Sequence, residues 1–222
     1  MQVNEERKIG DLCKIIANLG KDGGLMSPSV YDTAQVLRYC PPTEGVEPAL
    51  AWLASCQRPD GGWGDPIRSH TRDIPTIAAL LAFAEYSDFK GSGEIIEAGL
   101  NFLEQHHYQW EKVVPEDLPV GMELILPKLI SEAEQLGLQI PKDHYQNLIP
   151  IYQKKITYIR TMPVSTASAP AFSWEAWGES PDLNWLDELG SVGNSPTATA
   201  YWAYLAKDNP DLKVGLSEFD LI

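Results

Sequence analysis

Few residues of this 222-residue chain fall into patterns with a recognised chemistry. The sequence contains no Ser-His-Asp order, no glycine-rich phosphate loop and no HExxH pair of histidines. His106 and His107 are neighbours that would point to different faces of a helix, so we do not expect a shared metal site. Four tryptophans offer aromatic faces that could stabilise a cation or could simply fill a helical core: Trp174, Trp177, Trp185 and Trp202.

The three cysteines, Cys13, Cys40 and Cys56, are far apart and form no Cys-x-x-Cys pair. This pattern indicates free thiols in a reducing compartment rather than a metal or redox site. No apolar stretch approaches the ~20 residues that span a bilayer, and residues 1–8 do not resemble a signal peptide. We therefore expect a cytoplasmic location.

The chain is acidic, because 17 Lys and Arg oppose 31 Asp and Glu and give a formal net charge of −14. Such a charge repels phosphate backbones and anionic membrane surfaces, so we expect no nucleic-acid partner and no electrostatic membrane docking. Hydrophobic residues make up 44% of the chain and charged residues 22%, which is typical of a folded globule. The length suits one domain with a small appendage.

Apolar residues recur at spacings of three and four, which predicts amphipathic helices. Five such stripes occupy residues 46–57, 77–84, 95–103, 122–136 and 148–156. Gly137 is expected just beyond the end of the fourth stripe, where glycine commonly terminates a helix. The β-branched run at 156–159 is short and gives only thin support for a strand. The sequence thus predicts an all-α fold with tight Pro- and Gly-rich loops.

Two predicted helix starts resemble each other. Ser27-Pro28 and Ser195-Pro196 each place Ser at the N-cap and Pro at the first helical position, followed by small residues and Thr. This similarity suggests a repeated array of helical hairpins. Residues 210–222 show neither a cap nor a periodic face, so we expect this tail to fray.

The most informative segment is ALAWLASCQRPDGGWGD at residues 49–65. A helix is expected to end near Gln57, whose amide can bond free backbone groups at a neighbouring helix end. Asp60 and Gly61 belong to the following turn, in which we expect Asp60 to bond loop amides. The ring of Trp63 can then cover the Gln57 amide. This unit resembles the QW motif of terpene cyclases, a structural clamp between helical hairpins.

Further runs resemble class II diterpene cyclases of the copalyl diphosphate synthase type. LMSPSVYDTA at 25–34 resembles the family's SxSAYDTAW opening, with Gln35 in place of the last Trp. The family order continues through 101–103 (NFL), 119–130 (PVGMELILPKLI), 180–185 (SPDLNW) and 195–200 (SPTATA). The resemblance implies an α-helical barrel of helical hairpins, the α/α-toroid-like γ domain of these enzymes, over residues 25–209.

The same resemblance assigns residues 1–24 to a helix that packs in a separate β domain of the family, and it leaves 210–222 as a tail. An apolar face suggests that the N-terminal helix docks on a partner; the face consists of Ile9, Leu12, Cys13, Ile16 and Leu19. The family's catalytic acid lies in a DxDD motif of the β domain, and this sequence contains no Asp-x-Asp-Asp. Residues 188–194 depart from the family's second QW motif, so that clamp is missing or rebuilt.

The resemblance also implies a site for a diphosphate. Glu116 and Asp117 match the acidic segment that in the family helps to hold Mg²⁺ and the substrate diphosphate, and Mg²⁺ prefers oxygen ligands. Glu123 and Arg72 are further candidates for contact with Mg²⁺-diphosphate. Each has a structural alternative: Glu116 and Asp117 could favour a helix dipole, Glu123 could face solvent, and Arg72 could pair with Asp73 or another acid.

The resemblance therefore implies a γ-domain subunit or fragment of a class II diterpene cyclase that is not active alone. It would dock on a DxDD-bearing β-domain protein and complete the cavity for cyclisation of a prenyl diphosphate such as geranylgeranyl diphosphate. One alternative is a non-catalytic helical binding module on the same scaffold. Another is a single-domain cyclase with a relocated acid, which is least favoured because the sequence shows no clustered proton donor.

Overall fold

The computed structural model describes residues 28–106, 118, 121–210 and 212. Every regular element in these ranges is a helix, and they contain no β-strand. The all-α prediction is therefore confirmed, and residues 156–159 lie within a helix. No helix in these ranges is both long enough and apolar enough to cross a bilayer. The predicted segment 1–24 lies outside the described residues, as does the tail 210–222 except for 210 and 212.

The α-helices of the described ranges are ten to fourteen residues long, and short 3₁₀ helices connect several of them. The α-helices are α2 (Val30–Tyr39), α3 (Val46–Ser55), α4 (Asp73–Glu85), α5 (Ser92–Gln105), α6 (Met122–Gln135), α7 (Leu148–Thr161) and α8 (Pro196–Ala206). The 3₁₀ helices are η2 (Pro66–Arg72), η5 (Lys142–Tyr145), η6 (Ala169–Ala176) and η7 (Leu183–Trp185).

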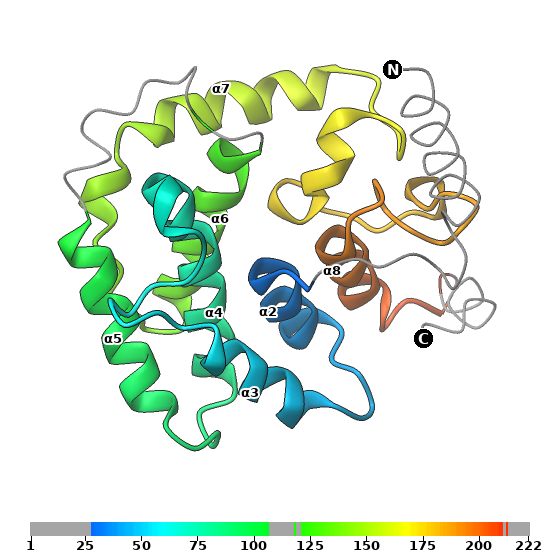
Figure 1. The fold of residues 1–222 in the computed structure, drawn as a ribbon. Helices are drawn as coiled ribbons and strands as arrows, with labels where there is room; N and C mark the ends of the chain where they lie inside the picture. Colours follow the sequence, from blue (N-terminus) through cyan, green and yellow to red (C-terminus); the bar gives the residue numbers. More distant parts are fainter. Residues whose placement is uncertain (1–27, 107–117, 119–120, 211, 213–222) are drawn as a thin grey trace, which may run out of the picture.

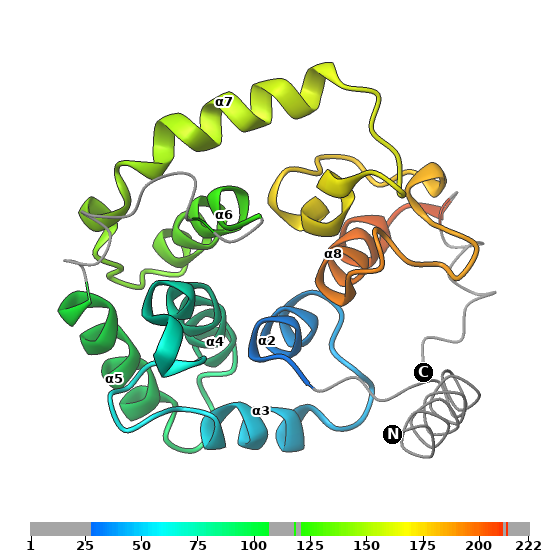
Figure 2. The same cartoon turned by 45° about the horizontal axis from the view of Figure 1, so that its top comes forward.

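The helices form a closed inner ring with further helices outside it. Along the ring α2 contacts α4, α4 contacts α6, α6 contacts η6, η6 contacts α8, and α8 returns to α2. The helices α3, α5 and α7 lie outside and pack on α2, α4 and α6, respectively (Figures 1 and 2). Each outer helix follows its inner partner in sequence, so the described region is the predicted ring of helical hairpins.

Helix α4 is the most completely buried element of the ring. All seven residues from 77 to 83 have an exposed fraction of 0%, because α2, α5 and α6 pack around this helix. Its apolar character on every face is what a helix enclosed by neighbours requires. Burial of these side chains contributes about 25 cal/mol for each Å² of apolar surface removed from water.

A second, smaller core joins η6, the loop before α8, and α8 itself. Trp174 and Trp202 are almost completely buried in it, and Trp177 and Trp185 pack at its edge. The Trp202 indole N–H donates to the carbonyl of Asp182 at 3.0 Å. All four tryptophans therefore serve packing, which is the core-filling alternative for these residues.

Helix caps confirm one of the two predicted Ser-Pro starts and correct the other. Ser195 caps α8 by accepting a hydrogen bond from the backbone N–H of Ala198, with Pro196 at the first helical position. Helix α2, by contrast, is capped by Ser29 rather than by Ser27, because the Ser29 hydroxyl accepts from the N–H of Asp32.

The end of α6 follows the sequence closely. Gly137 has a φ of +77°, and its N–H bonds the carbonyl of Glu134 while the N–H of Leu138 bonds that of Ala133. This pair of bonds is the Schellman arrangement, which satisfies carbonyls that the last helical turn leaves free. The predicted position of Gly137 beyond the helix is confirmed.

Two glycines of α5 should respond in opposite ways to alanine. A Cβ on Gly99 would lie 2.6 Å from Cδ2 of the buried Leu80 and 3.3 Å from the Trp63 ring, whereas a Cβ on Gly93 meets nothing within 4 Å. Alanine favours a helix over glycine, but crowding in a packed core is destabilising. We expect Gly99→Ala to lower the free energy of unfolding by about 1–3 kcal/mol and Gly93→Ala to raise it by about 0.5 kcal/mol.

Urea denaturation of both variants beside the parent chain measures these changes. Equal effects of the two substitutions would contradict the close packing of α5 on α4 and Trp63.

Candidate functional site

The predicted acidic site divides between described and undescribed residues. Glu116 and Asp117 lie outside the described residues. Glu123 stands in the first turn of α6, where it is 4% exposed. Its carboxylate forms an ion pair with the ammonium of Lys155 on α7. The solvent-facing alternative for Glu123 is therefore wrong, since the side chain is buried between two helices.

The ion pair with Lys155 makes Glu123 a weaker candidate for a metal ligand. A carboxylate already neutralised by Lys155 offers a weaker ligand than a free one, because the cation competes for the same oxygens. Within the described residues there is no group of three or more His, Cys, Asp or Glu side chains that could hold a metal ion. The described part of the chain thus does not form a complete Mg²⁺ site around Glu123.

The turn after α3 has the bonding expected of a clamp. The Gln57 amide nitrogen donates to the carbonyl of Gly61 at 2.9 Å and to that of Ile95, in the first turn of α5, also at 2.9 Å. Gly61 has a φ of +89°, and a Cβ there would lie 2.1 Å from the carbonyl oxygen of Ala98. Gln57 and the glycine therefore fix this turn against α5.

Trp63 ties the same turn to α3 and α4. It is completely buried, and its indole N–H donates to the carbonyl of Leu53, in the last turn of α3, at 2.7 Å. That carbonyl lies in the last turn of α3 and also accepts from the N–H of Cys56 at 3.1 Å. The Trp63 backbone N–H donates to the hydroxyl of Thr76 on α4 at 3.0 Å. One residue thus joins two helices.

Arg72 holds the same turn in place through bonds to Asp60 and Trp63. Its guanidinium is bidentate to the Asp60 carboxylate at 2.7 and 2.8 Å, its Nε donates to the carbonyl of Trp63 at 2.9 Å, and it lies 4.4 Å from the centroid of the Phe102 ring. The hydrogen bonds from Arg72 lower the pKa of Asp60 to about 2. Arg72 itself is only 2% exposed, so this geometry favours the salt-bridge alternative over contact with a diphosphate.

Arg72 pairs with Asp60, whereas Asp73 was the first acid named as its possible partner. Asp60 takes this role and also accepts a hydrogen bond from the N–H of Gly62, as predicted for a turn carboxylate. Asp73, the neighbour in sequence, accepts from the hydroxyl of Tyr145 at 2.8 Å.

The backbone of this turn has a characteristic set of hydrogen bonds. The N–H of Arg58 donates to the carbonyl of Gly62, and the N–H of Gly61 returns to the carbonyl of Arg58. These two bonds, together with the bond from the Trp63 backbone N–H to the hydroxyl of Thr76, define the turn.

A second turn repeats this set without the Gln or the Trp. The N–H of Asp187 donates to the carbonyl of Ser191, and the N–H of Gly190 (φ +76°) returns to the carbonyl of Asp187. The N–H of Val192 then donates to the hydroxyl of Thr199 on α8 at 3.0 Å. Val192 thus holds the place of the tryptophan and is equally buried.

The Asp187 carboxylate braces this second turn from within. It accepts from the N–H groups of Leu189 and Ser191 and from the Ser191 hydroxyl, and these bonds lower its pKa. At the second turn, where the clamp is predicted to be missing or rebuilt, the backbone bonds and the bond from Val192 to Thr199 are present, and the bonds of the Asp187 carboxylate lie within the turn.

Sequence reasoning missed a buried carboxyl inside the ring. Glu175 of η6 is 3% exposed, and its Oε1 accepts from the hydroxyl of Tyr31 on α2 at 2.7 Å. Its other oxygen has no hydrogen-bond partner among the residues that the structure describes. Burial raises the pKa of Glu175 to about 7, because the charged form loses its hydration. Only the tertiary fold brings these two residues together, so no local signal identified Glu175.

Two further groups of polar contacts join α2 to α8 and to α6. The Asp32 carboxylate accepts from the hydroxyl of Thr197 at 2.8 Å, which links the starts of α2 and α8. The Glu132 carboxylate of α6 accepts from the hydroxyl of Tyr39 and pairs with Arg38, both near the end of α2. Asp32 thus serves as the partner of a hydroxyl that joins two helices.

Two diphosphate synthases are similar to this chain in sequence. The chain is 40% identical over 220 residues to the (+)-kolavenyl diphosphate synthase of Herpetosiphon aurantiacus. The matched region covers 92% of this chain and 42% of that protein. It is 31% identical over 223 residues to a chloroplastic (−)-kolavenyl diphosphate synthase of Tripterygium wilfordii, covering 92% of this chain and 26% of that protein.

Two solved structures are also similar. Abietadiene synthase from Abies grandis matches with a TM-score of 0.69 at 24% identity, over 92% of this chain and 29% of that one. The ent-copalyl diphosphate synthase from Arabidopsis thaliana matches with a TM-score of 0.66 at 27% identity, over 83% of this chain and 28% of that one. The chain is a class II diterpene cyclase-like domain.

No protein-family model matches this cyclase-like domain. The domain spans about two-fifths of its bacterial relative and about a quarter of its plant relative. Most of the polar residues that it buries hold helices together.

Replacement of Arg72 by lysine separates the two roles considered for this residue. An ammonium cannot make both bonds to Asp60 and the bond to the Trp63 carbonyl, so we expect Arg72→Lys to lower the free energy of unfolding by about 2 kcal/mol. Arg160→Lys, at an exposed ion pair with Glu179, is the matched control and should change stability by less than about 0.5 kcal/mol. Unchanged stability together with weaker diphosphate binding would instead support a ligand-binding role.

Glu175 should make the stability of the cyclase-like domain depend on pH. Its pKa is about 7 in the folded chain against an ordinary value of 4.5, so the folded state retains a proton that the unfolded chain releases above about pH 4.5. Stability contributed by this protonated carboxyl is therefore present at low pH and lost as the pH rises to about 7. The full effect is on the order of 3 kcal/mol.

Glu175→Gln cannot ionise and should flatten this dependence in denaturation curves recorded from about pH 5 to pH 8. The exposed Glu179→Gln is the control and should leave the slope unchanged. Parallel curves for the parent chain and Glu175→Gln would exclude Glu175 as the titrating group.

Proposed function

We propose that this chain is the γ domain of a class II diterpene cyclase and works with a β-type domain that carries the catalytic acid. One observation carries this proposal: the chain is 40% identical to a kolavenyl diphosphate synthase, yet it contains no Asp-x-Asp-Asp. The chain spans 42% of that relative. A β-type domain, in the same polypeptide or in a partner protein, would supply the acid.

The proposed substrate is a prenyl diphosphate such as geranylgeranyl diphosphate. In this reaction class an aspartic acid of the β domain protonates the terminal alkene, and the resulting cation closes rings by attack of the internal alkenes. Loss of a proton ends the sequence, and the diphosphate is retained. The contribution of this chain would be to form one wall of the chamber and exclude water, because a carbocation is rapidly captured by water.

We propose that Glu116 and Asp117 supply oxygen ligands for Mg²⁺ bound to the diphosphate. A divalent cation would offset the repulsion between two carboxylates and the anionic substrate. The Glu123–Lys155 pair would then support α6 without binding the metal directly.

The proposed location is the cytoplasm. Cys40 and Cys56 are free thiols, which fits a reducing compartment.

A second candidate function is a non-catalytic helical binding module. It is favoured by the engagement of Arg72 and Glu123 in ion pairs within the domain. It also fits the lack of a three-ligand metal group among the described residues.

Reconstitution tests the proposed function. The purified chain is mixed with a DxDD-bearing β-type protein, Mg²⁺ and geranylgeranyl diphosphate, and cyclic products are measured by mass spectrometry. We expect products only when both proteins are present, because the proton donor and the chamber wall lie on different domains. The same products with and without this chain would contradict the proposal, and turnover by the chain alone would support a single-domain cyclase.

The acidic segment is tested in the same mixture. Glu116→Ala combined with Asp117→Ala should reduce Mg²⁺-dependent diphosphate binding, measured by calorimetry, by about tenfold or more. The control removes two exposed charges of α5, Glu94 and Glu97, and should leave binding unchanged. Diphosphate binding that is unaffected by the first pair would favour the binding module.

A further inference from the structure

The first turn of α2 closes the ring through two polar contacts. The Tyr31 hydroxyl donates to Glu175 of η6 at 2.7 Å, and the Asp32 carboxylate accepts from the hydroxyl of Thr197 on α8 at 2.8 Å. Helices α2 and α8 lie side by side (Figures 1 and 2). We call these four residues the seam, because loss of their contacts would part the first described helix from the last two elements of the ring.

The opposite end of α2 is held in a different way, by ion pairs. The Arg38 guanidinium pairs with Glu85 of α4 at 2.9 Å and with Glu132 of α6 at 2.9 Å. The Tyr39 hydroxyl also donates to Glu132. Each carboxylate at this end therefore has a cation beside it, and ionisation of these carboxylates keeps the end of α2 in place.

Glu175 has no such cation. None of the ion pairs among the described residues includes it. Only 3% of the residue is exposed, and its Oε2 has no hydrogen-bond partner in the described part of the chain. A buried carboxylate without a cation or a full set of donors is costly. The neutral acid therefore suits this position better than the ionised form.

The surrounding groups also disfavour a negative charge on Glu175. The titratable groups on the helices around η6 are Tyr31 and Asp32 of α2, Glu132 of α6, and Tyr201 of α8, whose ring lies 5.8 Å from that of Trp174. Burial raises the pKa of Glu175, the Tyr31 hydrogen bond lowers it, and the charges of Asp32 and Glu132 raise it further. The nearby cations, Arg38 and Lys128, pair with Glu132 instead.

We propose that Glu175 is a pH-sensitive switch that holds the seam closed only while it keeps its proton. When the carboxyl group releases this proton to solvent, the start of α2 moves away from η6 and water reaches the carboxylate. Arg38 keeps the other end of α2 in place, so the opening is local. This switch differs from a change in global stability, because the rest of the ring stays folded. It does not depend on the proposed cyclase function.

Amide hydrogen exchange of the full-length chain, read by peptide mass spectrometry, tests this opening. Residues 33–37 of α2 are compared with residues 77–83 of α4, in the parent chain and in Glu175→Gln, near pH 6 and near pH 8. Comparison of the two chains at one pH removes the chemical effect of pH on exchange. The pKa of Glu175 is about 7 in the closed ring against an ordinary value of 4.5. The ratio of the parent rate to the Glu175→Gln rate in α2 should therefore rise by about tenfold between these pH values.

Each outcome decides the proposal. A rise confined to α2 supports it. A ratio that does not change with pH would show that Glu175 does not control the seam, and an equal rise in α4 would show that the whole domain unfolds. Either result overturns the proposal. If Glu175→Gln does not fold, the parent chain alone suffices, because its α2 exchange relative to α4 exchange should rise by about tenfold over the same pH range, and a constant ratio overturns the switch.

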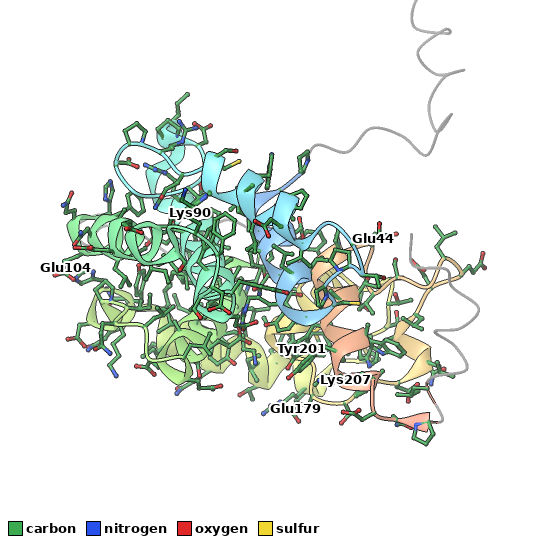
Figure 3. All side chains as sticks on the ribbon, turned by 90° about the horizontal axis from the view of Figure 1, so that it is seen from below. Glu44, Lys90, Glu104, Glu179, Tyr201 and Lys207 are labelled. Atoms are coloured by element: carbon green, nitrogen blue, oxygen red, sulfur yellow. The ribbon has the colours of Figure 1, made fainter. Side chains whose placement is uncertain are left out.

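Two further variants act as controls. Thr197→Val removes the donor to Asp32 but no titrating group, so it should raise exchange in α2 by a similar factor at both pH values. Loss of the pH dependence in Thr197→Val would assign the switch to Asp32 and overturn the role of Glu175. Glu179, labelled in Figure 3, lies at the edge of the molecule in that view, and its side chain is 71% exposed. Glu179→Gln should therefore follow the parent chain.

Discussion

Closure of the ring depends on the contact between its first and last described helices. Asp32 and Thr197 are 165 positions apart in sequence and meet at 2.8 Å, while Tyr31 reaches Glu175 from the same turn of α2. Contacts between residues so far apart carry a large loop-closure cost that local helix contacts do not. The buried polar groups at this seam specify one arrangement of the ring, since a shifted α2 would leave them without partners.

The sequence predicts those parts of the structure that arise from local forces. Apolar spacing locates the helices, Ser195-Pro196 marks the start of α8, and Gly137 marks the end of α6. The first helix start was misplaced by two residues, because Ser27 and Ser29 both precede a helix-forming run and the choice between them depends on packing. Glu175 and its partner Tyr31 lie outside the reach of local reasoning, since nothing near either residue in sequence reveals the other.

The predicted functional residues also divide into those whose role follows from the local sequence and those whose role depends on a distant partner. Asp60, Gly61 and Trp63 are expected in a structural clamp from their residue types and from the resemblance to the QW motif, and the hydrogen bonds of Asp60 and Trp63 fit such a clamp. Arg72 and Glu123 were candidates for a diphosphate site, but the described structure pairs each with an opposite charge inside the domain. The local sequence does not distinguish these roles, because the same side chain serves either, and the decisive partner lies on another element. Glu116 and Asp117 remain predictions.

The two clamp turns, at 58–63 and 187–192, share their backbone hydrogen bonds although the second has neither glutamine nor tryptophan. The two turns therefore share a backbone bonding geometry and a buried side chain, Trp63 or Val192. Their polar side chains act differently, since the Gln57 amide reaches α5 and the Asp187 carboxylate bonds within its own turn. Two turns of one fold can thus differ in residue type while keeping the same backbone hydrogen bonds. Within the described residues, a search by residue type would find the turn at 58–63 and miss the turn at 187–192, whereas a comparison of backbone bonding finds both.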